Sequence, residues 1–522
     1  MGYLQAYNEV LSYLRSKGKE RPFLREVAAR LDERPDSLHL IEAPTGYGKT
    51  SLTMAAALRE LREGFKLLVA YPLRSLIEDQ AERIGDFLSA SGHGLALGVR
   101  YMGNPSSPYL VHPVTLTTVD TLSLTSLGLS PEDAGKVFSE YLGVNGSMGH
   151  YLFSWASAYT ASLFLDEVHL LYDSSKSLSF LWALLELSLE FGNGVALMSA
   201  TIPSTFASAF KNGFPSLVHS RFRGDSDEVF YRGRKAKKYK VELRPTRAVG
   251  KFETLLEVLK RESFRKALVV FNTVEEAVEF YMGLGDYGEK VLIHSRFSLE
   301  DRKAKGERVK SMKEGVVVGT QAIEAGLDFS SDLILTDLAP ANSLIQRFGR
   351  FLRGEEERTG KAIVWYEEEL LEKGQYKVYD ASLAKRTLQY LEGKGGEVNL
   401  HVGYDSVLDY VYSEEPTVDR RLVSEVVSVV TNLVNPSTSA AELLMSLGGS
   451  LIREGNVFAA VTGGGREVPV GFGFLRSRCI KALDQRGREE ECPGSEREAA
   501  IKAIRGFKFL VRGEYSEEVG LR

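Results

Sequence analysis

Short apolar runs alternate with stretches of helical periodicity along the first part of this chain. The runs at residues 38–41, 66–70 and 114–118 are strand-like, and helical patterns follow the first two. Similar runs return at residues 162–165 and 194–198. Strands that alternate with helices in this way are typical of βα units in a parallel sheet. The pattern therefore predicts one parallel sheet in the N-terminal part of the chain, which we place at residues 1–220.

A second series of apolar runs follows further along the chain. These runs are residues 266–271, 291–294, 315–319 and 332–336. They predict a second parallel sheet, in residues 221–370. Helical and strand-like segments in a less regular order come next, so we expect an accessory C-terminal domain at residues 371–522. The predicted fold class is α/β, with two tandem parallel-sheet lobes and that accessory domain.

Between the two series lies a strongly basic segment. Residues 231–240 contain six basic residues, two tyrosines and no acidic residue. Two interpretations stay open, an exposed basic β-ribbon or a contact with a phosphate backbone in which the tyrosines stack on bases. The whole chain carries a net charge of −5. A nucleic-acid surface must therefore be a local patch or groove.

The composition favours a soluble protein. The most apolar stretch, residues 178–189, is too short to span a bilayer and contains Glu186. Residues 1–19 lack the apolar stretch of a secretion signal. We expect a cytoplasmic protein with no membrane partner. The two cysteines, Cys479 and Cys492, are expected to be free thiols, with one disulfide as the alternative.

Residues 43–50, A-P-T-G-Y-G-K-T, stand between the first apolar run and a helical segment. Strand, glycine-bearing loop and helix start make a phosphate-binding loop, whose backbone N–H groups and helix dipole face the phosphates. Lys49 would reach the β- and γ-phosphates, and the Thr50 hydroxyl would hold a Mg²⁺ ion. The expected nucleotide-binding residues of this loop are Thr45, Gly46, Tyr47, Gly48, Lys49 and Thr50.

The apolar run at residues 162–165 ends in two carboxylates, Asp166 and Glu167. Buried acids without partners are costly, so such an ending needs a function. Beside a phosphate loop, Asp166 would hold the Mg²⁺ ion together with Thr50. Glu167 would orient and deprotonate the attacking water. The two roles need adjacent positions, because the metal and the nucleophile lie on neighbouring sides of the γ-phosphate.

Residues 343–353, S-L-I-Q-R-F-G-R-F-L-R, predict a helix with one apolar face. Gln346, Arg350 and Arg353 are left to project elsewhere, and the two arginines share a face because they are three residues apart. From a second lobe, two guanidinium groups can clamp the charge that develops on a transferring phosphoryl group. We therefore assign Arg350 and Arg353, with Lys49, Asp166 and Glu167, to catalysis.

Motifs of these kinds, in this order, resemble those of superfamily 2 helicases with two RecA-like lobes. Three second-lobe motifs resemble the helicase subunit of CRISPR type I interference. They are H-S-R-F at residues 294–297, T-Q-A-I-E-A-G-L-D-F at 320–329 and A-P-A-N-S-L-I-Q-R-F-G-R at 339–350. The resemblance covers residues 20–355 approximately. The phosphate loop and the D-E-V-H box at 166–169 alone would indicate only the superfamily.

The resemblance implies further roles. ATP with Mg²⁺ would lie between the lobes, where Asp328 and Gln346 help to form the site. His169, Ser199 and Thr201 would couple hydrolysis to movement of the lobes. A single DNA strand would cross both lobes, and the lobes would step along it in the 3′ to 5′ direction. The residues implied to contact DNA are Arg74, Thr118, Ser295, Arg296 and Thr320.

Two departures from the family pattern change the expectation. Many relatives carry an HD nuclease with a His-Asp pair, but none of the eight histidines here is followed by Asp. The chain therefore resembles a split form, which would work with a separate HD nuclease subunit and an RNA-guided surveillance complex. In R-P-F-L-R at residues 21–25, Leu24 replaces the glutamine that usually reads adenine. Selection of ATP over other triphosphates is thus an open point.

Two other functions compete with this one. A superfamily 2 DNA or RNA helicase of repair or RNA metabolism would carry the same phosphate loop and acidic box. An ATP-gated scaffold that hydrolyses nothing is a third possibility, and the presence of Lys49, Asp166, Glu167 and Arg350 argues against it.

Overall fold

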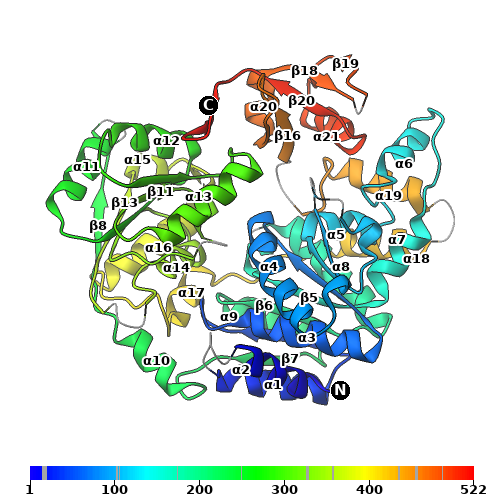
Figure 1. The fold of residues 1–522 in the computed structure, drawn as a ribbon, viewed down its shortest axis with the longest axis horizontal. Coiled ribbons are helices and arrows are strands. Elements are labelled where there is room, and N and C mark those ends of the chain that lie inside the picture. Colours follow the sequence, from blue (N-terminus) through cyan, green and yellow to red (C-terminus); the bar gives the residue numbers. More distant parts are fainter. Residues whose placement is uncertain are drawn as a thin grey trace.

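The computed structural model describes residues 1–14, 20–101, 104, 106–172, 174–247, 250–324, 328–354, 358–432, 436–452, 457–484 and 486–522. Two lobes lie side by side, and the C-terminal residues lie across one end of both (Figure 1). Among the described residues, no helix is both long and apolar enough to cross a bilayer.

The first lobe is built on a seven-stranded sheet in the order β3-β4-β2-β5-β6-β1-β7, and all its pairings are parallel. The strands are β1 Leu38–Glu42, β2 Lys66–Tyr71, β3 Leu97–Arg100, β4 Val114–Thr118, β5 Ala161–Asp166, β6 Val195–Ser199 and β7 Val218–Arg221. The helices are α1 Tyr3–Leu14, α2 Pro22–Glu33, α3 Lys49–Glu63, α4 Arg74–Ala90, α5 Val119–Ser126, α6 Ala134–Tyr141, α7 Tyr151–Tyr159, α8 Ser175–Glu190 and α9 Ser204–Gly213. Buried aliphatic runs make the strands, as expected for a sheet covered on both faces.

The second lobe has a six-stranded parallel sheet in the order β10-β11-β9-β12-β13-β8. Its strands are β8 Val241–Pro245, β9 Lys266–Val270, β10 Lys290–Ile293, β11 Gly315–Gly319, β12 Leu333–Asp337 and β13 Lys361–Tyr366. Its helices are α11 Lys251–Arg261, α12 Val274–Gly283, α13 Leu299–Ser311, α14 Ala341–Phe348 and the short α15 Glu368–Leu371. The predicted fold class, with two parallel-sheet lobes, is confirmed.

The basic segment between the lobes is not a ribbon. Residues Glu228–Lys235 form helix α10, which lies between β7 of the first sheet and β8 of the second. Asp227 caps its N-terminus by accepting a hydrogen bond from the Phe230 N–H. The expected β-ribbon is therefore wrong: the cap and the three cations in the last turn favour a helix, because they complement its dipole.

The residues beyond the second sheet form two parts. Helices α16 Ala381–Gly393, α17 Asp405–Val411, α18 Arg420–Thr431 and α19 Pro436–Ser446 share one apolar core with both lobes. Residues from 457 onwards have a core of their own, under a mixed sheet in the order β17-β16-β20-β18-β19. Its elements are β16 Val457–Val461, β17 Glu467–Gly471, α20 Phe472–Arg478, β18 Cys479–Leu483, β19 Glu489–Glu490, α21 Glu496–Ile504 and β20 Lys508–Val511.

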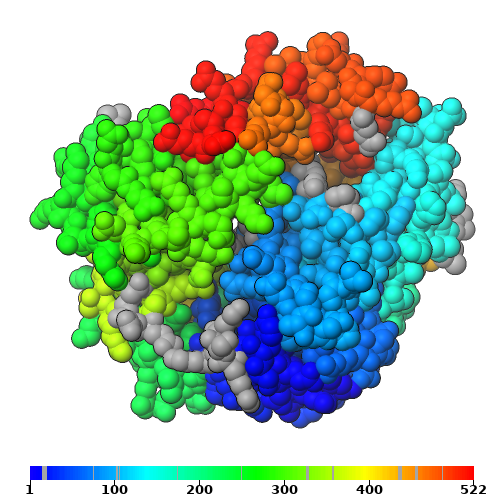
Figure 2. All heavy atoms as spheres, in the orientation of Figure 1, coloured from blue at the N-terminus to red at the C-terminus, as the bar shows by residue number. Residues whose placement is uncertain are grey.

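This C-terminal sheet contacts both lobes (Figure 2). On the first lobe, α21 packs against α6. On the second lobe, the chain ends in a small hairpin of β21 Tyr515–Ser516 and β22 Gly520–Leu521. The Leu521 N–H donates to the Arg296 carbonyl over 3.0 Å. The His294 Nε2 atom lies 3.0 Å from the Val519 carbonyl oxygen.

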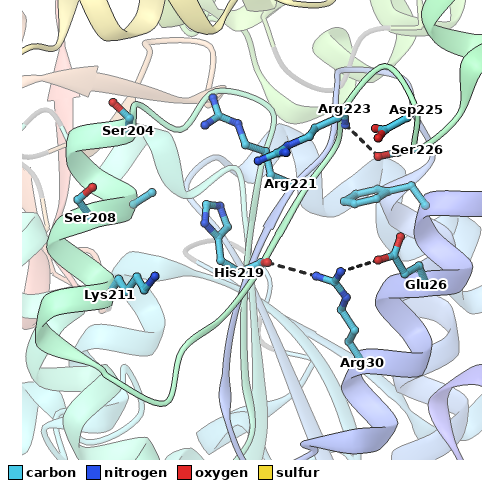
Figure 3. Close-up of a pocket in the computed structure, with 12 residues that line it drawn as sticks. Glu26, Arg30, Ser204, Ser208, Lys211, His219, Arg221, Arg223, Asp225 and Ser226 are labelled. Carbon is cyan, nitrogen blue, oxygen red and sulfur yellow. Dashed lines mark hydrogen bonds and ion pairs between the residues drawn. The ribbon is translucent and has the colours of Figure 1, made fainter.

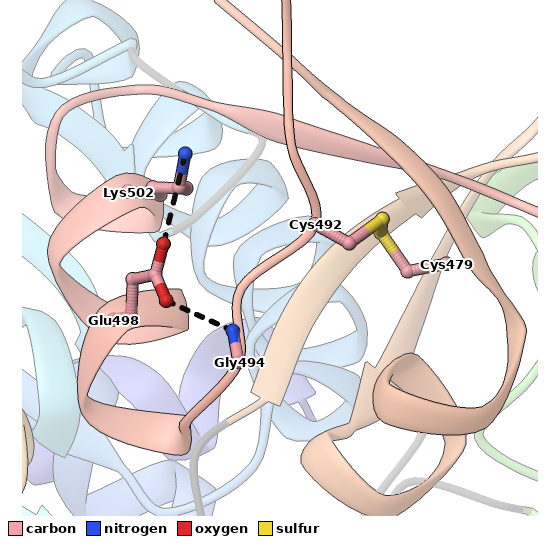
Figure 4. The surroundings of a disulfide bond; sticks show 5 residues. All are labelled: Cys479, Cys492, Gly494, Glu498 and Lys502. Atoms are coloured by element: carbon pink, nitrogen blue, oxygen red, sulfur yellow. Dashed lines mark hydrogen bonds and ion pairs between the residues drawn. A yellow bond between two sulfur atoms is a disulfide. The ribbon is translucent and has the colours of Figure 1, made fainter.

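The two cysteines form a disulfide within this sheet (Figure 4). Cys479 begins β18, and Cys492 lies in the segment that leads to α21, with a Cα–Cα distance of 6.0 Å. That separation is in the normal range for a disulfide. The expectation of free thiols is wrong, and the alternative of one disulfide is confirmed. Spacing in the sequence did not reveal that the fold brings the two segments together.

Candidate nucleotide site and nucleic-acid interface

The phosphate loop forms the turn between β1 and α3, as the sequence predicts. Gly46 and Gly48 adopt positive φ angles of 76° and 106°, a conformation that glycine reaches without strain. Lys49 and Thr50 occupy the first turn of α3. The Tyr47 side chain is buried and its hydroxyl donates to Asp227 Oδ2 over 3.1 Å. Tyr47 can therefore contact a nucleotide only through its backbone.

The acidic pair stands opposite this loop, at the C-terminal end of β5. Glu167 has a φ of 54°, and its N–H donates to Asp166 Oδ1 over 2.9 Å. The Lys49 ammonium lies 3.5 Å from Glu167 Oε1, so the lysine of the loop faces the acid at the end of β5, two strands away in the sheet. A left-handed residue other than glycine is strained, and such strain is frequent at functional sites.

Burial and charge shift the titration of these three groups. Burial and the charge of Glu167 raise the pKa of Asp166. Burial acts in the same direction on Glu167, but Lys49 and His169 outweigh it and lower the pKa of that carboxyl. Burial would lower the pKa of Lys49, yet the two carboxylates raise it. Glu167 is thus held as a carboxylate, the form that a general base needs.

His169 and the Ser199-Ala200-Thr201 triplet lie together behind the acidic pair. The His169 Nδ1 atom is 3.0 Å from Ser199 Oγ and 3.4 Å from Glu167 Oε2. Ser199 Oγ also accepts the Thr201 N–H over 3.1 Å. A chain of polar contacts therefore connects Glu167 with the end of β6, and the coupling role of these residues stays a prediction.

The second lobe reaches the loop directly. In α14, Gln346 Oε1 accepts a hydrogen bond from the Thr45 hydroxyl over 3.2 Å. A Cβ atom on Gly349 would lie 2.8 Å from Thr45 Cγ2, so the lobes touch closely here. This seam between the lobes is the place that the sequence predicts for the nucleotide.

Arg350 and Arg353 approach the same seam. Arg350 is buried, and its guanidinium donates to the carbonyls of Ile323 and Glu324. Burial and the charge of Arg353 lower the pKa of Arg350 to about 10, while the nearby Glu167 acts to raise it. Arg353 pairs with Asp328, Nη1 to Oδ1, over 3.2 Å. The cations of the second lobe thus stand within electrostatic reach of the acidic pair of the first.

Sequence reasoning missed Arg347. Its guanidinium is fully buried and binds Glu324 Oε1 at 2.8 Å, Thr336 Oγ1 at 2.9 Å and the Asp337 carbonyl at 2.8 Å. It also donates to Asn272 Oδ1 and to the Tyr379 hydroxyl. A helical pattern assigns such an arginine to the surface, because the partners come from distant segments that no local signal connects.

One buried polar atom at the seam suits a bound nucleotide. Gln346 Nε2, on the residue that contacts Thr45, has no hydrogen-bond partner among the described residues. Buried polar groups are nearly always satisfied, so this atom suggests a ligand or water between the lobes. The raised pKa of Asp166 also fits a carboxylate that a cation would stabilise, as expected for a Mg²⁺ ligand.

The residues expected to contact DNA have mixed surroundings. Ser295 is exposed, whereas Thr118 and Thr320 are buried. Thr118 caps α5 by accepting the Thr121 N–H, so its hydroxyl has a structural partner. Arg74 lies over the Tyr101 ring.

Arg296 pairs with Glu275 Oε1 over 2.5 Å and stacks on Phe474 of the C-terminal sheet. All five DNA contacts therefore stay predictions. In the T-Q-A-I-E-A-G-L-D motif, residues 325–327 lie outside the described part of the chain.

A separate cavity of about 660 Å³ adjoins the first lobe at its edge strand β7 (Figure 3). Helices α2 and α9 form its walls. Within it, Arg30 donates to Glu26 and to the His219 carbonyl. Phe23, which also lines the cavity, packs at a tilt against the Tyr47 ring of the phosphate loop, with centroids 6.1 Å apart. Leu24, next to it, is fully buried beside Gly48 and offers no polar atom to a base.

The fold has the two RecA-like lobes of superfamily 2 helicases, with the candidate nucleotide site at the seam between them. A model of the DEAD/DEAH box helicase family matches residues 25–209. A second model, described as CRISPR-associated nuclease/helicase Cas3, C-terminal, matches residues 263–356. Within that class, the second lobe is similar to the CRISPR-associated Cas3 helicases, as its motifs predicted.

Curated relatives and solved structures agree. The CRISPR-associated helicase Cas3 of Thermoproteus tenax is 28% identical over 362 residues, which are 65% of this chain and 59% of that protein. The nuclease/helicase Cas3 of Methanothermobacter thermautotrophicus is 24% identical, over 72% of this chain and 46% of its own length. The chain thus spans about half the length of these relatives. The crystal structure of T. fusca Cas3 covers 98% of this chain and 70% of its own, with a TM-score of 0.65 and 16% identity.

Proposed function

We propose that this protein is an ATP hydrolase that moves along single-stranded DNA and unwinds target DNA in CRISPR type I interference. The observation that carries the proposal is the seam itself. The phosphate loop and acidic pair of the first lobe meet Gln346, Arg350 and Arg353 of the second lobe there. A site shared by two lobes can convert the cleavage of one bond into a change of their separation.

The residues at the seam divide the chemistry among themselves. Backbone N–H groups of residues 45–50 and Lys49 bind the phosphates. Glu167, held as a carboxylate, orients the attacking water and takes its proton. Mg²⁺, when bound by Thr50 and Asp166, supplies neutralisation of the phosphate charge. Arg350 and Arg353 stabilise the charge that develops on the transferring group from the opposite lobe.

Movement follows from the contacts across the seam. With the nucleotide bound, Thr45 and Gln346 hold the lobes together, and the loss of a phosphate releases Arg350 and Arg353. His169 and Ser199 pass the change from Glu167 to the end of β6. Repeated closing and opening would move the lobes along a strand bound at Arg74, Ser295 and Arg296.

We extend the proposal to two partners. One neighbour in structure is part of a complex described as a CRISPR RNA-guided surveillance complex, pre-nicking, with a TM-score of 0.61. Several relatives are named nuclease/helicase, whereas no histidine of this sequence is followed by Asp. These points support a role beside a surveillance complex, with a separate HD nuclease subunit that cuts the unwound DNA.

Replacement of Glu167 by Gln tests the proposal. The variant keeps the size of the side chain but loses the base, so kcat for ATP should fall by about 10²–10⁴-fold while ATP binding stays. Glu190→Gln, at the exposed end of α8, is the control and should hydrolyse ATP at the wild-type rate. Equal turnover in the two variants would contradict the assignment.

The nucleic acid is tested separately. Stimulation of ATPase activity by single-stranded DNA but not by RNA supports the proposal, and the reverse result favours a helicase of RNA metabolism.

A further inference from the structure

Helix α10 carries the basic residues for which the helicase motifs give no role. Arg232 points to solvent, with a side chain 75% exposed that pairs with Glu228 one turn earlier. Arg234 points the other way. A Cβ atom on Gly46 of the phosphate loop would lie 3.3 Å from Arg234 Nη2. The same point lies 3.9 Å from Nε of Arg353. Two guanidinium groups, one from α10 and one from the second lobe, therefore approach the phosphate loop at Gly46.

The phosphate loop itself fixes the position of this helix. The N-cap of α10, Asp227, accepts a hydrogen bond from the Tyr47 hydroxyl over 3.1 Å. Phe230, in the first turn, packs edge-on against the Tyr47 ring with centroids 4.9 Å apart. The Arg234 guanidinium in turn lies over the Phe230 ring, at 5.2 Å from its centroid. The contacts of Tyr47 with Asp227 and Phe230 thus hold the Arg234 guanidinium beside the loop.

The charges around the loop favour an anion with several negative charges. The backbone N–H groups and the N-terminus of α3 already contribute positive potential. Arg234 adds a further cation at the place where the phosphates of a nucleotide would lie. A guanidinium can bind a phosphate oxygen through two N–H groups, which gives geometry as well as charge.

We propose that Arg234 is an additional nucleotide-binding residue, which contacts a phosphate of the bound nucleotide from the linker between the lobes. The proposal rests on the proposed function only in that residues 43–50 bind a nucleotide. It gives the linker a direct part in sensing the phosphates. Helix α10 leads into β8 of the second lobe. A displacement of Arg234 by the phosphates would therefore be transmitted to that lobe without involving α14.

The experiment compares Arg234→Ala and Arg234→Lys with the matched control Arg232→Ala on the same helix. Calorimetry measures the affinity of each full-length variant for ATP and for ADP, with Mg²⁺ present. Loss of a hydrogen bond between charged groups should weaken the ATP affinity of Arg234→Ala by about tenfold or more. Arg234→Lys should retain part of the affinity, because it keeps the charge but loses the two parallel N–H groups of the guanidinium. Arg232→Ala should bind like the wild type.

The ADP titration shows which phosphate is contacted, since a loss for ATP alone indicates the γ-phosphate and a loss for both indicates the β-phosphate. Thermal unfolding without nucleotide serves as a second measurement. A lower melting temperature with unchanged affinities would mean that Arg234 only stacks on Phe230, and the proposal would be overturned. If the wild type itself binds no nucleotide, the proposed function fails, which is a different result from a variant that binds as well as the wild type.

Discussion

Removal of the Arg347 guanidinium should destabilise the second lobe strongly. The group is fully buried, and its partners include the Glu324 carboxylate and the Asn272 amide oxygen. In Arg347→Ala these partners remain in the core without a donor. Breaking a buried ion pair by removing one partner costs about 3–5 kcal/mol. At about 2–4 °C per kcal/mol for units of 150–250 residues, the melting temperature should fall by about 6–20 °C.

The assay is thermal unfolding followed by circular dichroism at pH 7.5, with Arg421→Ala as the control. Arg421 also pairs with a glutamate, Glu425, but its side chain is 88% exposed. Exposed pairs contribute little, so the control should unfold like the wild type. Arg347→Lys should fall between the two, because an ammonium replaces the charge but cannot reach all the acceptors. If Arg347→Ala unfolds at the temperature of the control, the buried network does not stabilise the lobe and the reasoning is refuted.

Two further predictions follow from the seam and from the buried histidines. Gly349→Ala places a methyl group 2.8 Å from Thr45 Cγ2, closer than carbon atoms normally approach, so kcat for ATP should fall several-fold with little change in melting temperature. Gly306→Ala in α13, where a Cβ atom meets nothing within 4 Å, is the control. Equal kcat values in the two variants would contradict the idea of a tight seam. Burial lowers the pKa of His294 and of His401 to about 3 each, whereas an exposed histidine titrates near pH 6.5. Below about pH 6.5 the unfolded chain therefore takes up protons that the folded chain does not. The histidine contribution to the free energy of unfolding should be fully present above that pH and should decline as the pH falls towards 3. The decline is up to about 1.4 kcal/mol per pH unit for each histidine. Urea unfolding at several pH values measures this, and His294→Gln should flatten the decline.

The sequence predicted those parts that local patterns determine. The strands show as aliphatic runs, and the glycines of residues 43–50 show as a turn because their positive φ angles suit no other residue. The acidic ending of β5 and the arginines at 350 and 353 stood out because charged residues there have few structural uses. The helix predicted over residues 343–353 is wrong in its extent: α14 ends at Phe348, so Arg350 and Arg353 follow the helix and do not share a helical face. Their meeting across two lobes could be expected only from the resemblance, since nothing in the spacing brings residue 45 to residue 346.

Other parts depend on tertiary contacts and were missed. The basic segment at α10 becomes a helix because Asp227 caps it and the phosphate loop packs against it. A segment of eight residues is too short for its hydrophobic periodicity to indicate a helix. In the sequence, Arg347 resembles any arginine of a helix. Its burial depends on Asn272 and Glu324, which lie in the segments after β9 and β11. The disulfide between Cys479 and Cys492 joins two segments that lie close together only because the C-terminal sheet folds as it does.

The C-terminal sheet has a mechanical consequence for the lobe movement that we propose. Helices α18 and α19 fasten the C-terminal residues to the first lobe through an apolar core, while Val519 is inserted into the core of the second. The strands between these anchors act as a strap over the gap. A strap of fixed length limits how far the halves can separate, because an extended chain gains only about 3.3–3.6 Å per residue. The sheet meets the second lobe at the Arg466–Glu300 pair, and residues 512–514 connect β20 to the hairpin that carries Val519. The length of that short connector would set the largest separation of the lobes in the proposed cycle.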